Sequence, residues 1–156
     1  MITQILSSIS GDGIITLLGT ITAIGVSIFT FRTIHKYNRQ LEISNMVDKI
    51  LDVAIQYPHF EDQDFTNSWS RKSKDVEQLR YDLYCCKIFN LINTLWIFCK
   101  ENKQKMAKIV AYRELMEWHK SWWGQNRDLN SKGYGTKFCT FIENEFKLML
   151  PPVEEE

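Results

Sequence analysis

An acidic run, EDQD at residues 61–64, follows His59 and contains the residue types that most readily bind a cation. A calcium-binding loop needs alternating oxygen ligands, a central glycine and a closing glutamate. Here Asn67 occupies the glycine position and Ser73 occupies the glutamate position. The pattern therefore favours solvated loop charges, and we predict no metal site.

His119 lies in an unusual aromatic run, WHKSWW, at residues 118–123. Tryptophan is enriched at the hot spots of protein interfaces, but it also fills cores. Two interpretations of this run stay open, core packing and a protein contact surface. If the run is a contact surface, the aromatic residues of the neighbouring loops join it. The predicted partner surface then consists of Trp69, Trp122, Trp123 and Tyr134.

The chain contains no recognised catalytic signature. We find no G-x-S-x-G, no H-E-x-x-H and no Walker loop. Its four cysteines form no C-x-x-C pair, which is typical of reduced thiols in the cytosol. Cys85, Cys86 and Cys99 lie in an apolar stretch, where burial raises the pKa of a thiol and makes it inert. We predict a protein that is not an enzyme and that uses no cofactor.

An uncharged stretch near the N-terminus predicts a transmembrane helix over residues 13–34. No charged residue occurs from Ile14 to Phe31, and 18 residues of helix extend about 27 Å, close to the thickness of a bilayer core. A buried core helix of a soluble protein is the alternative. A signal peptide is disfavoured, because no basic region precedes the run and no small-residue cleavage site follows it.

The charges that flank this stretch predict its orientation. The segment before it carries only Asp12, whereas Arg32, Lys36 and Arg39 follow it. Basic residues are retained in the cytoplasm. We therefore expect residues 1–12 to form a short extracytoplasmic tail, and residues 35–150 to form a cytosolic domain at the inner membrane.

One face of the predicted transmembrane helix combines small and hydroxyl-bearing residues. At 100° per residue they fall within one arc, while the larger apolar residues lie outside it. Such ladders let two helix backbones approach closely, and hydroxyls can bond across the contact. We expect this face to pack on a second copy or on a membrane-protein partner, although a chance arrangement is the alternative. Its members are Thr16, Gly19, Thr20, Ala23 and Ser27.

The remainder of the chain predicts an all-α fold, a transmembrane helix followed by an antiparallel cytosolic four-helix bundle. With only 7 glycines and 3 prolines, long helices are favoured. Apolar spacing predicts helices that continue from the anchor to Tyr57 and then span about 73–100, 102–123 and 136–150. The helix at about 73–100 has a mostly apolar interior, which favours a central helix over a second membrane span because Lys87 would be costly in lipid. We expect loops at 58–74 and 124–135, and an acidic tail at 151–156.

Antiparallel helices would return the turn at residues 100–108 to the membrane. Basic residues at a membrane surface attract anionic lipid headgroups. The predicted lipid-binding residues are Arg32, Lys36, Arg39, Lys100, Lys103, Lys105 and Lys108. The alternative is that these lysines are a solvated helix end.

The layout resembles that of small bacterial single-pass membrane-anchored helical proteins of unknown function. The resemblance runs through RTIHKYNRQLEISNMVDKILDVA, RYDLYCCKIFNLINTLWIF, ELMEWHKSWW and GYGTKFCTFIENEF. Some such proteins are encoded near anti-phage systems.

Taken together, these patterns predict a membrane-anchored interaction protein, that is, a scaffold, sensor or accessory subunit. The expected partners are membrane lipids, a second copy or membrane protein at the anchor, and a cytosolic protein. The net charge of zero gives no argument for nucleic acid. The alternatives are an oligomerising membrane-perturbing effector and an anchored enzyme.

Overall fold

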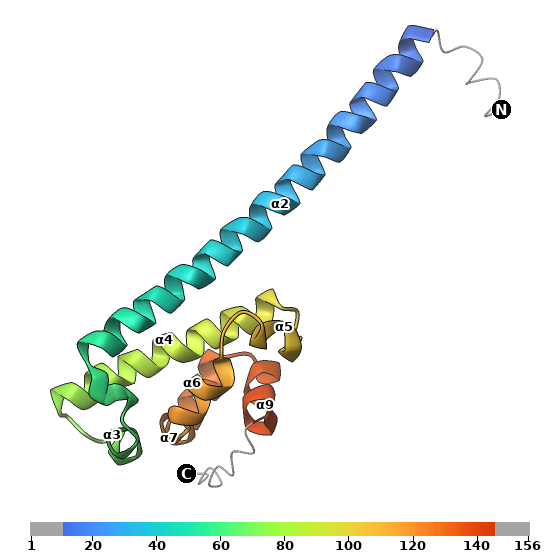
Figure 1. Ribbon diagram of the computed structural model, residues 1–156. Coiled ribbons are helices and arrows are strands. Elements are labelled where there is room, and N and C mark those ends of the chain that lie inside the picture. The colour runs from blue at the N-terminus through green and yellow to red at the C-terminus, as the bar shows by residue number, and fades with distance from the viewer. Residues whose placement is uncertain (1–10, 146–156) are drawn as a thin grey trace. The chain divides into compact units, whose positions relative to one another are not determined.

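The computed structural model describes residues 11–145, and within that range it is all-helical, without strands (Figure 1). This confirms the predicted all-α class. The predicted acidic tail lies outside the described residues, and so does most of the predicted extracytoplasmic tail. The chain divides into two compact units, with the boundary between Leu41 and Glu42.

Helix α2, Gly11–Gln56, is the longest element. It contains no proline, and neither of its two central glycines, Gly19 and Gly25, interrupts it. The helix is continuous through residues 35–38, where the charge pattern would also have allowed a break. Among the described residues, α2 is the one helix that is long and apolar enough to cross a membrane.

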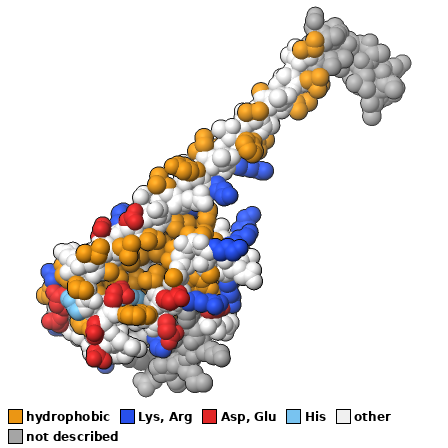
Figure 2. Space-filling model, in the orientation of Figure 1, with side chains coloured by type: hydrophobic (Ala, Val, Ile, Leu, Met, Phe, Trp, Pro, Cys, Tyr) orange, Lys and Arg blue, Asp and Glu red, His pale blue; other side chains and the backbone are white. Residues whose placement is uncertain are grey.

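The first unit consists of the α2 residues before the boundary. All of its side chains from Ile15 to Asn38 are exposed. Hydrophobic side chains follow one another along its surface in Figure 2. Ile15, Phe29 and Phe31 are each at least 70% exposed. A contiguous apolar surface of this kind marks a membrane or protein contact.

The second unit has its own hydrophobic core, and helix α4, Val76–Phe98, passes through it. Eight residues of α4 are buried, and they lie along one broad side of the helix. Helix α4 begins at Asp75, whose carboxylate accepts hydrogen bonds from the backbone N–H groups of Glu77 (2.9 Å) and Gln78 (3.2 Å). The helix, predicted over about 73–100, therefore begins later than expected, at Val76. Ile43 and Ile50 of α2 belong to this core.

The segment predicted as the first loop folds into two short helices, η1, Pro58–Glu61, and α3, Gln63–Ser68. Asp62 caps α3, because its Oδ1 accepts from the N–H groups of Asp64 and Phe65. Phe60 is fully buried and contacts the Tyr81 ring at a centroid distance of 5.5 Å. The aromatic residues of this segment thus close it onto α4.

The predicted long helix at 102–123 was wrong, because the chain forms three short helices there. These are α5, Lys103–Ala107, α6, Tyr112–Trp118, and α7, Lys120–Gln125. The first interruption contains Ile109 and Val110, two β-branched residues with low helix propensity. The second falls at His119, whose side chain is fully buried.

The predicted loop at 124–135 was also wrong, because it contains helix α8, Arg127–Gly133. Its composition favours a turn, but two buried asparagines hold it against α7. Asn126 Nδ2 donates to the carbonyl of Trp122 (3.2 Å), and Asn130 Nδ2 donates to that of Trp123 (3.4 Å). Tertiary bonding overrides local propensity here. Helix α9, Thr136–Glu145, begins where predicted, and residues 146–150 lie outside the described range.

Candidate functional site

The small-residue face of α2 is exposed, and its hydroxyls bond within the helix. Thr20 Oγ1 donates to the carbonyl of Thr16 (2.9 Å), and Ser27 Oγ donates to that of Ala23 (2.8 Å). A side chain added at Gly19 would meet nothing within 4 Å. The hydroxyl donors of Thr20 and Ser27 are thus satisfied without water, which suits a lipid environment. Packing against a second helix stays a prediction, and it would rest on small size more than on new hydrogen bonds.

The predicted lipid-binding residues fall in both units. Arg32, Lys36 and Arg39 lie on the first unit's part of α2. The four predicted lysines of the second unit follow the C-terminal end of α4 in the sequence. Lys105 belongs to α5 and Lys108 caps it. Lys100 and Lys103 line hollows in the surface, and Lys137, which the sequence analysis missed, lines them too.

We call these hollows, between the end of α4 and the start of α9, the Trp96 groove. One cavity has a volume of about 410 Å³, and an adjoining one has about 330 Å³. Both are lined by Trp96, Glu101 and Lys137. The floor is aromatic, because the Trp96 ring stacks on Phe141 with centroids 4.1 Å apart and planes 17° apart. The remaining lining residues are Asn93, Ile97, Lys100, Lys103, Gly135, Thr136, Phe138, Thr140 and Asn144.

A tight turn shapes one wall of the groove. Lys100 and Glu101 have φ values of 51° and 63°, in the left-handed region that residues other than glycine rarely adopt. The Glu101 N–H donates to the Trp96 carbonyl at 2.9 Å, and this bond closes the end of α4. Asn102 then caps α5 by accepting from the Lys105 N–H, also at 2.9 Å. The turn thus places Lys100 and Lys103 on either side of Glu101.

The groove carries an excess of positive charge. Glu145 pairs with both Lys103 and Arg113, and hydrogen bonding to Lys103 lowers the pKa of its carboxyl. Lys137 Nζ lies 3.6 Å from Glu101 Oε1, and both side chains are at least half exposed. Four positive residues, Lys100, Lys103, Arg113 and Lys137, therefore stand against two carboxylates, a net charge of +2. Surface pairs of this kind are weak and can exchange partners.

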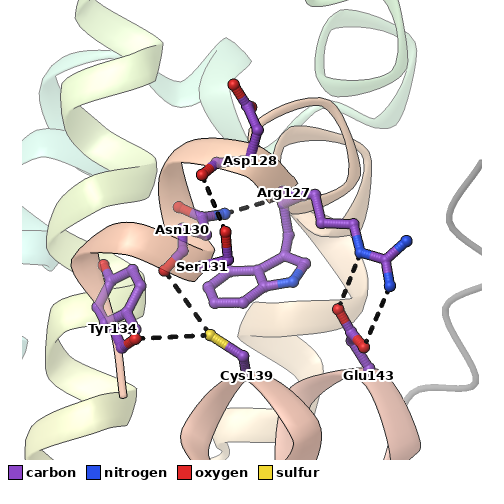
Figure 3. Close-up of polar contacts among 8 residues, drawn as sticks. Arg127, Asp128, Asn130, Ser131, Tyr134, Cys139 and Glu143 are labelled. Carbon is purple, nitrogen blue, oxygen red and sulfur yellow. Dashed lines mark hydrogen bonds and ion pairs between the residues drawn. The ribbon is translucent and has the colours of Figure 1, made fainter. Parts of the chain in front are cut away.

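Contacts between α8 and α9 hold the second wall in place (Figure 3). The Arg127 guanidinium reaches Glu143 through Nε, at 3.1 Å, and through Nη2, at 3.5 Å. The Cys139 thiol lies 3.7 Å from the carbonyl of Asn130 and 3.9 Å from that of Tyr134. These contacts fix α9, which carries Lys137 and Phe141 into the groove.

The tryptophans of the predicted partner surface lie in the core, so this prediction was wrong for them. Trp69, Trp122 and Trp123 are at most 3% exposed. Trp122 Nε1 donates to Asp82 Oδ1 at 2.7 Å, and Trp69 Nε1 donates to the Gln78 carbonyl at 3.1 Å. The alternative of core packing holds. Tyr134 is half-buried, and its hydroxyl donates to Asn90 Oδ1 at 2.9 Å.

His119 joins a buried polar network with Tyr81, Tyr84 and Glu61, which we call the His119 network. His119 Nδ1 and the Tyr81 hydroxyl share a hydrogen bond of 2.8 Å. His119 Nε2 lies 3.5 Å from Glu61 Oε1, too far for a normal hydrogen bond, and the Tyr84 hydroxyl donates to the same oxygen. A carboxylate at that position favours a proton on Nε2, so Nδ1 accepts from Tyr81.

The pKa values in this network follow its burial. Burial raises the pKa of both tyrosine hydroxyls, which keeps them neutral. Burial also acts to raise the pKa of Glu61, but the neighbouring His119 ring and Tyr84 hydroxyl outweigh it, and the pKa lies below its usual value. His119 is 0% exposed. The interior of the second unit is thus not wholly apolar. Because the imidazole is fully buried, a substrate has no access to it, and the role of the network is structural.

Comparisons with family models, with curated proteins and with solved structures find no match to this chain.

Proposed function

We propose that this chain is a membrane-anchored interaction protein, a scaffold, sensor or accessory subunit with a single transmembrane helix. In this proposal residues 13–34 cross the inner membrane, with the N-terminus outside and the second unit in the cytoplasm. Arg32, Lys36 and Arg39 support that orientation through the retention of basic residues inside. The antiparallel four-helix arrangement predicted from the sequence also stays a proposal.

The observation that carries the proposal is the exposed apolar surface of α2. The segment from Ile14 to Phe31 contains no charge, and the large apolar side chains from Ile15 to Phe31 are about half to three-quarters exposed. Its hydroxyls donate to carbonyls four residues earlier, as Thr22 does to Leu18 at 2.9 Å. A segment that satisfies its own polar groups and exposes its apolar side chains is suited to lipid.

The interaction role is supported by an exposed apolar face on α4. Val76, Leu79 and Leu83 follow the i, i+3, i+7 spacing that places residues on one side of a helix. They are 58%, 51% and 65% exposed. The opposite side of α4 is buried in the core. We therefore assign the contact with a protein partner to this face, in place of the buried tryptophans.

The intrahelical bonds of Thr20 and Ser27 favour this role over that of a membrane-perturbing effector. Their hydroxyl protons are directed at their own helix backbone, whereas a water-filled assembly would use them to line a polar path.

Extraction of membranes with alkaline carbonate tests the anchor. The full chain should stay in the membrane fraction. Ile21→Lys with Ile24→Lys should release it, because each lysine near the centre of the span costs about 3 kcal/mol. The matched control is Ile109→Lys with Leu129→Lys, two exposed positions in the second unit, which should leave extraction unchanged. Release of the unaltered chain would overturn the proposal.

Association through the small-residue face is tested by resonance energy transfer between labelled copies in bilayers. Gly19→Leu with Ala23→Leu should reduce the transfer, because bulk keeps the two backbones apart. Gly25→Leu is the control, since Gly25 lies off this face and also has open space around it. Equal transfer for all three chains would exclude this face as a contact between copies.

A further inference from the structure

We infer that the Trp96 groove binds the phosphate of an anionic lipid headgroup. The inference rests on the proposed anchor, because a domain attached to a bilayer meets headgroups at high local concentration. It deepens the proposal by naming the ligand class and the residues that hold it.

Three lysines from three different segments converge on the groove. Lys100 comes from the turn after α4, Lys103 from α5 and Lys137 from α9. Lysine is a common phosphate ligand because its ammonium is a compact charge with three donors. The three lysines and Arg113 stand against the carboxylates of Glu101 and Glu145, and the resulting net charge of +2 complements a phosphate. Lys137 is 82% exposed at its side chain, so its weak pair with Glu101 can open to a ligand.

The aromatic floor distinguishes this site from a simple patch of lysines. Trp96 is half-buried and stacks on Phe141, so its ring is held in place at the groove. Lys103 Nζ also lies 5.7 Å from the centroid of the Phe141 ring. Tryptophan is enriched at the headgroup level of membranes, where its ring has an apolar body and a polar edge. A lipid presents both a phosphate and the apolar carbons of its acyl chains, and such a site matches both.

The turn that places Lys100 is conformationally costly. Lys100 and Glu101 are two successive residues other than glycine in the left-handed region, and such strain clusters at functional sites. The cavity of about 410 Å³ is also larger than a bare ion needs, and it falls in the range of small-molecule sites. The volume favours a headgroup as the occupant over a free phosphate.

The test measures lysine accessibility in the full chain, reconstituted in nanodiscs. One set contains phosphatidylcholine alone, and the other contains one third phosphatidylglycerol. An amine-reactive reagent and mass spectrometry give the labelling rate of each lysine. In anionic discs Lys137 should be labelled about fivefold more slowly, the effect of about 1 kcal/mol. Lys72 and Lys74, which lie outside the groove, should keep their rates.

Two variants of equal charge separate the groove from general attraction. Lys100→Gln with Lys103→Gln should abolish the protection of Lys137. Lys105→Gln with Lys108→Gln, neighbours that do not line the groove, should preserve it. Equal loss of protection in both pairs, or equal rates in the two kinds of disc, would overturn the inference. Protection by millimolar inorganic phosphate in phosphatidylcholine discs would also overturn it, in favour of a free anion.

Failure of the proposed anchor gives a different result. A chain that does not co-purify with the discs contradicts the proposed function itself. A chain that inserts but shows no protection of Lys137 contradicts only the inference about the groove.

Discussion

The His119 network and the Trp96 groove are built from similar residue types, but they meet water differently. In the network, the rings of Tyr81 and Tyr84 pack against His119. The Tyr81 hydroxyl is hydrogen-bonded to His119, and the Tyr84 hydroxyl is hydrogen-bonded to Glu61. In the groove, Trp96 and Phe141 form a floor below exposed lysines. The first is closed off from water, although His119 Nε2 has no hydrogen-bond partner there, whereas the second leaves positive charge and aromatic surface open. The contrast teaches that His119, Trp122 and Trp123 of the conspicuous WHKSWW run support the fold, and that the proposed binding groove is built from residues scattered along the sequence.

His119→Leu should lower the free energy of unfolding more than a substitution in the groove does. A small effect would contradict the contrast between the network and the groove. The substitution leaves the buried Tyr81 hydroxyl without its partner and Glu61 without its neighbouring ring. Loss of a partner in a buried polar network costs about 3 kcal/mol. The measurement is the free energy of unfolding of the second unit, followed by near-ultraviolet circular dichroism of the full chain in detergent.

The matched control for that experiment is Lys137→Gln in the groove. Its exposed pair with Glu101 is weak, so the free energy of unfolding should change by less than about 0.5 kcal/mol. Equal effects of the two substitutions would mean that the network and the groove do not differ in the way described.

The pH dependence of stability sharpens the same comparison with a smaller effect. The pKa of Glu61 is lower in the folded chain than its ordinary value of 4.5. Its contribution to stability is therefore present above that value and is lost as the pH falls through the folded pKa. Thermal melts between neutral pH and pH 3 should show this loss. Glu61→Gln should make the acid dependence shallower, and an unchanged acid limb would show that the network does not hold the carboxylate.

The sequence predicted the elements that depend on local pattern. An uncharged run predicted the apolar part of α2, and apolar residues on nearly every face predicted that α4 is a core helix. In each case one stretch of chain contains all the information required.

The remaining features depend on contacts between distant residues. The helix is interrupted at His119, and His119 is hydrogen-bonded to Tyr81, which lies 38 positions away in the sequence. Helix α8 depends on bonds from Asn126 and Asn130 to α7, although its composition is that of a turn. The groove unites Trp96 with Phe141 and Lys137, and no local spacing indicates that meeting. Periodicity cannot supply such pairings, so the lysines at 100–108 were predicted without the aromatic floor beside them.

The central claim, that α2 spans a bilayer, is tested most directly by digesting the full chain in vesicle membranes. Protease is given access to both sides, and the peptides that stay in the lipid are identified by mass spectrometry. The account predicts one retained segment that covers Ile14 to Phe31, while peptides from α4 to α9 are released. Release of that segment with the rest, or retention of α4 in its place, would contradict it.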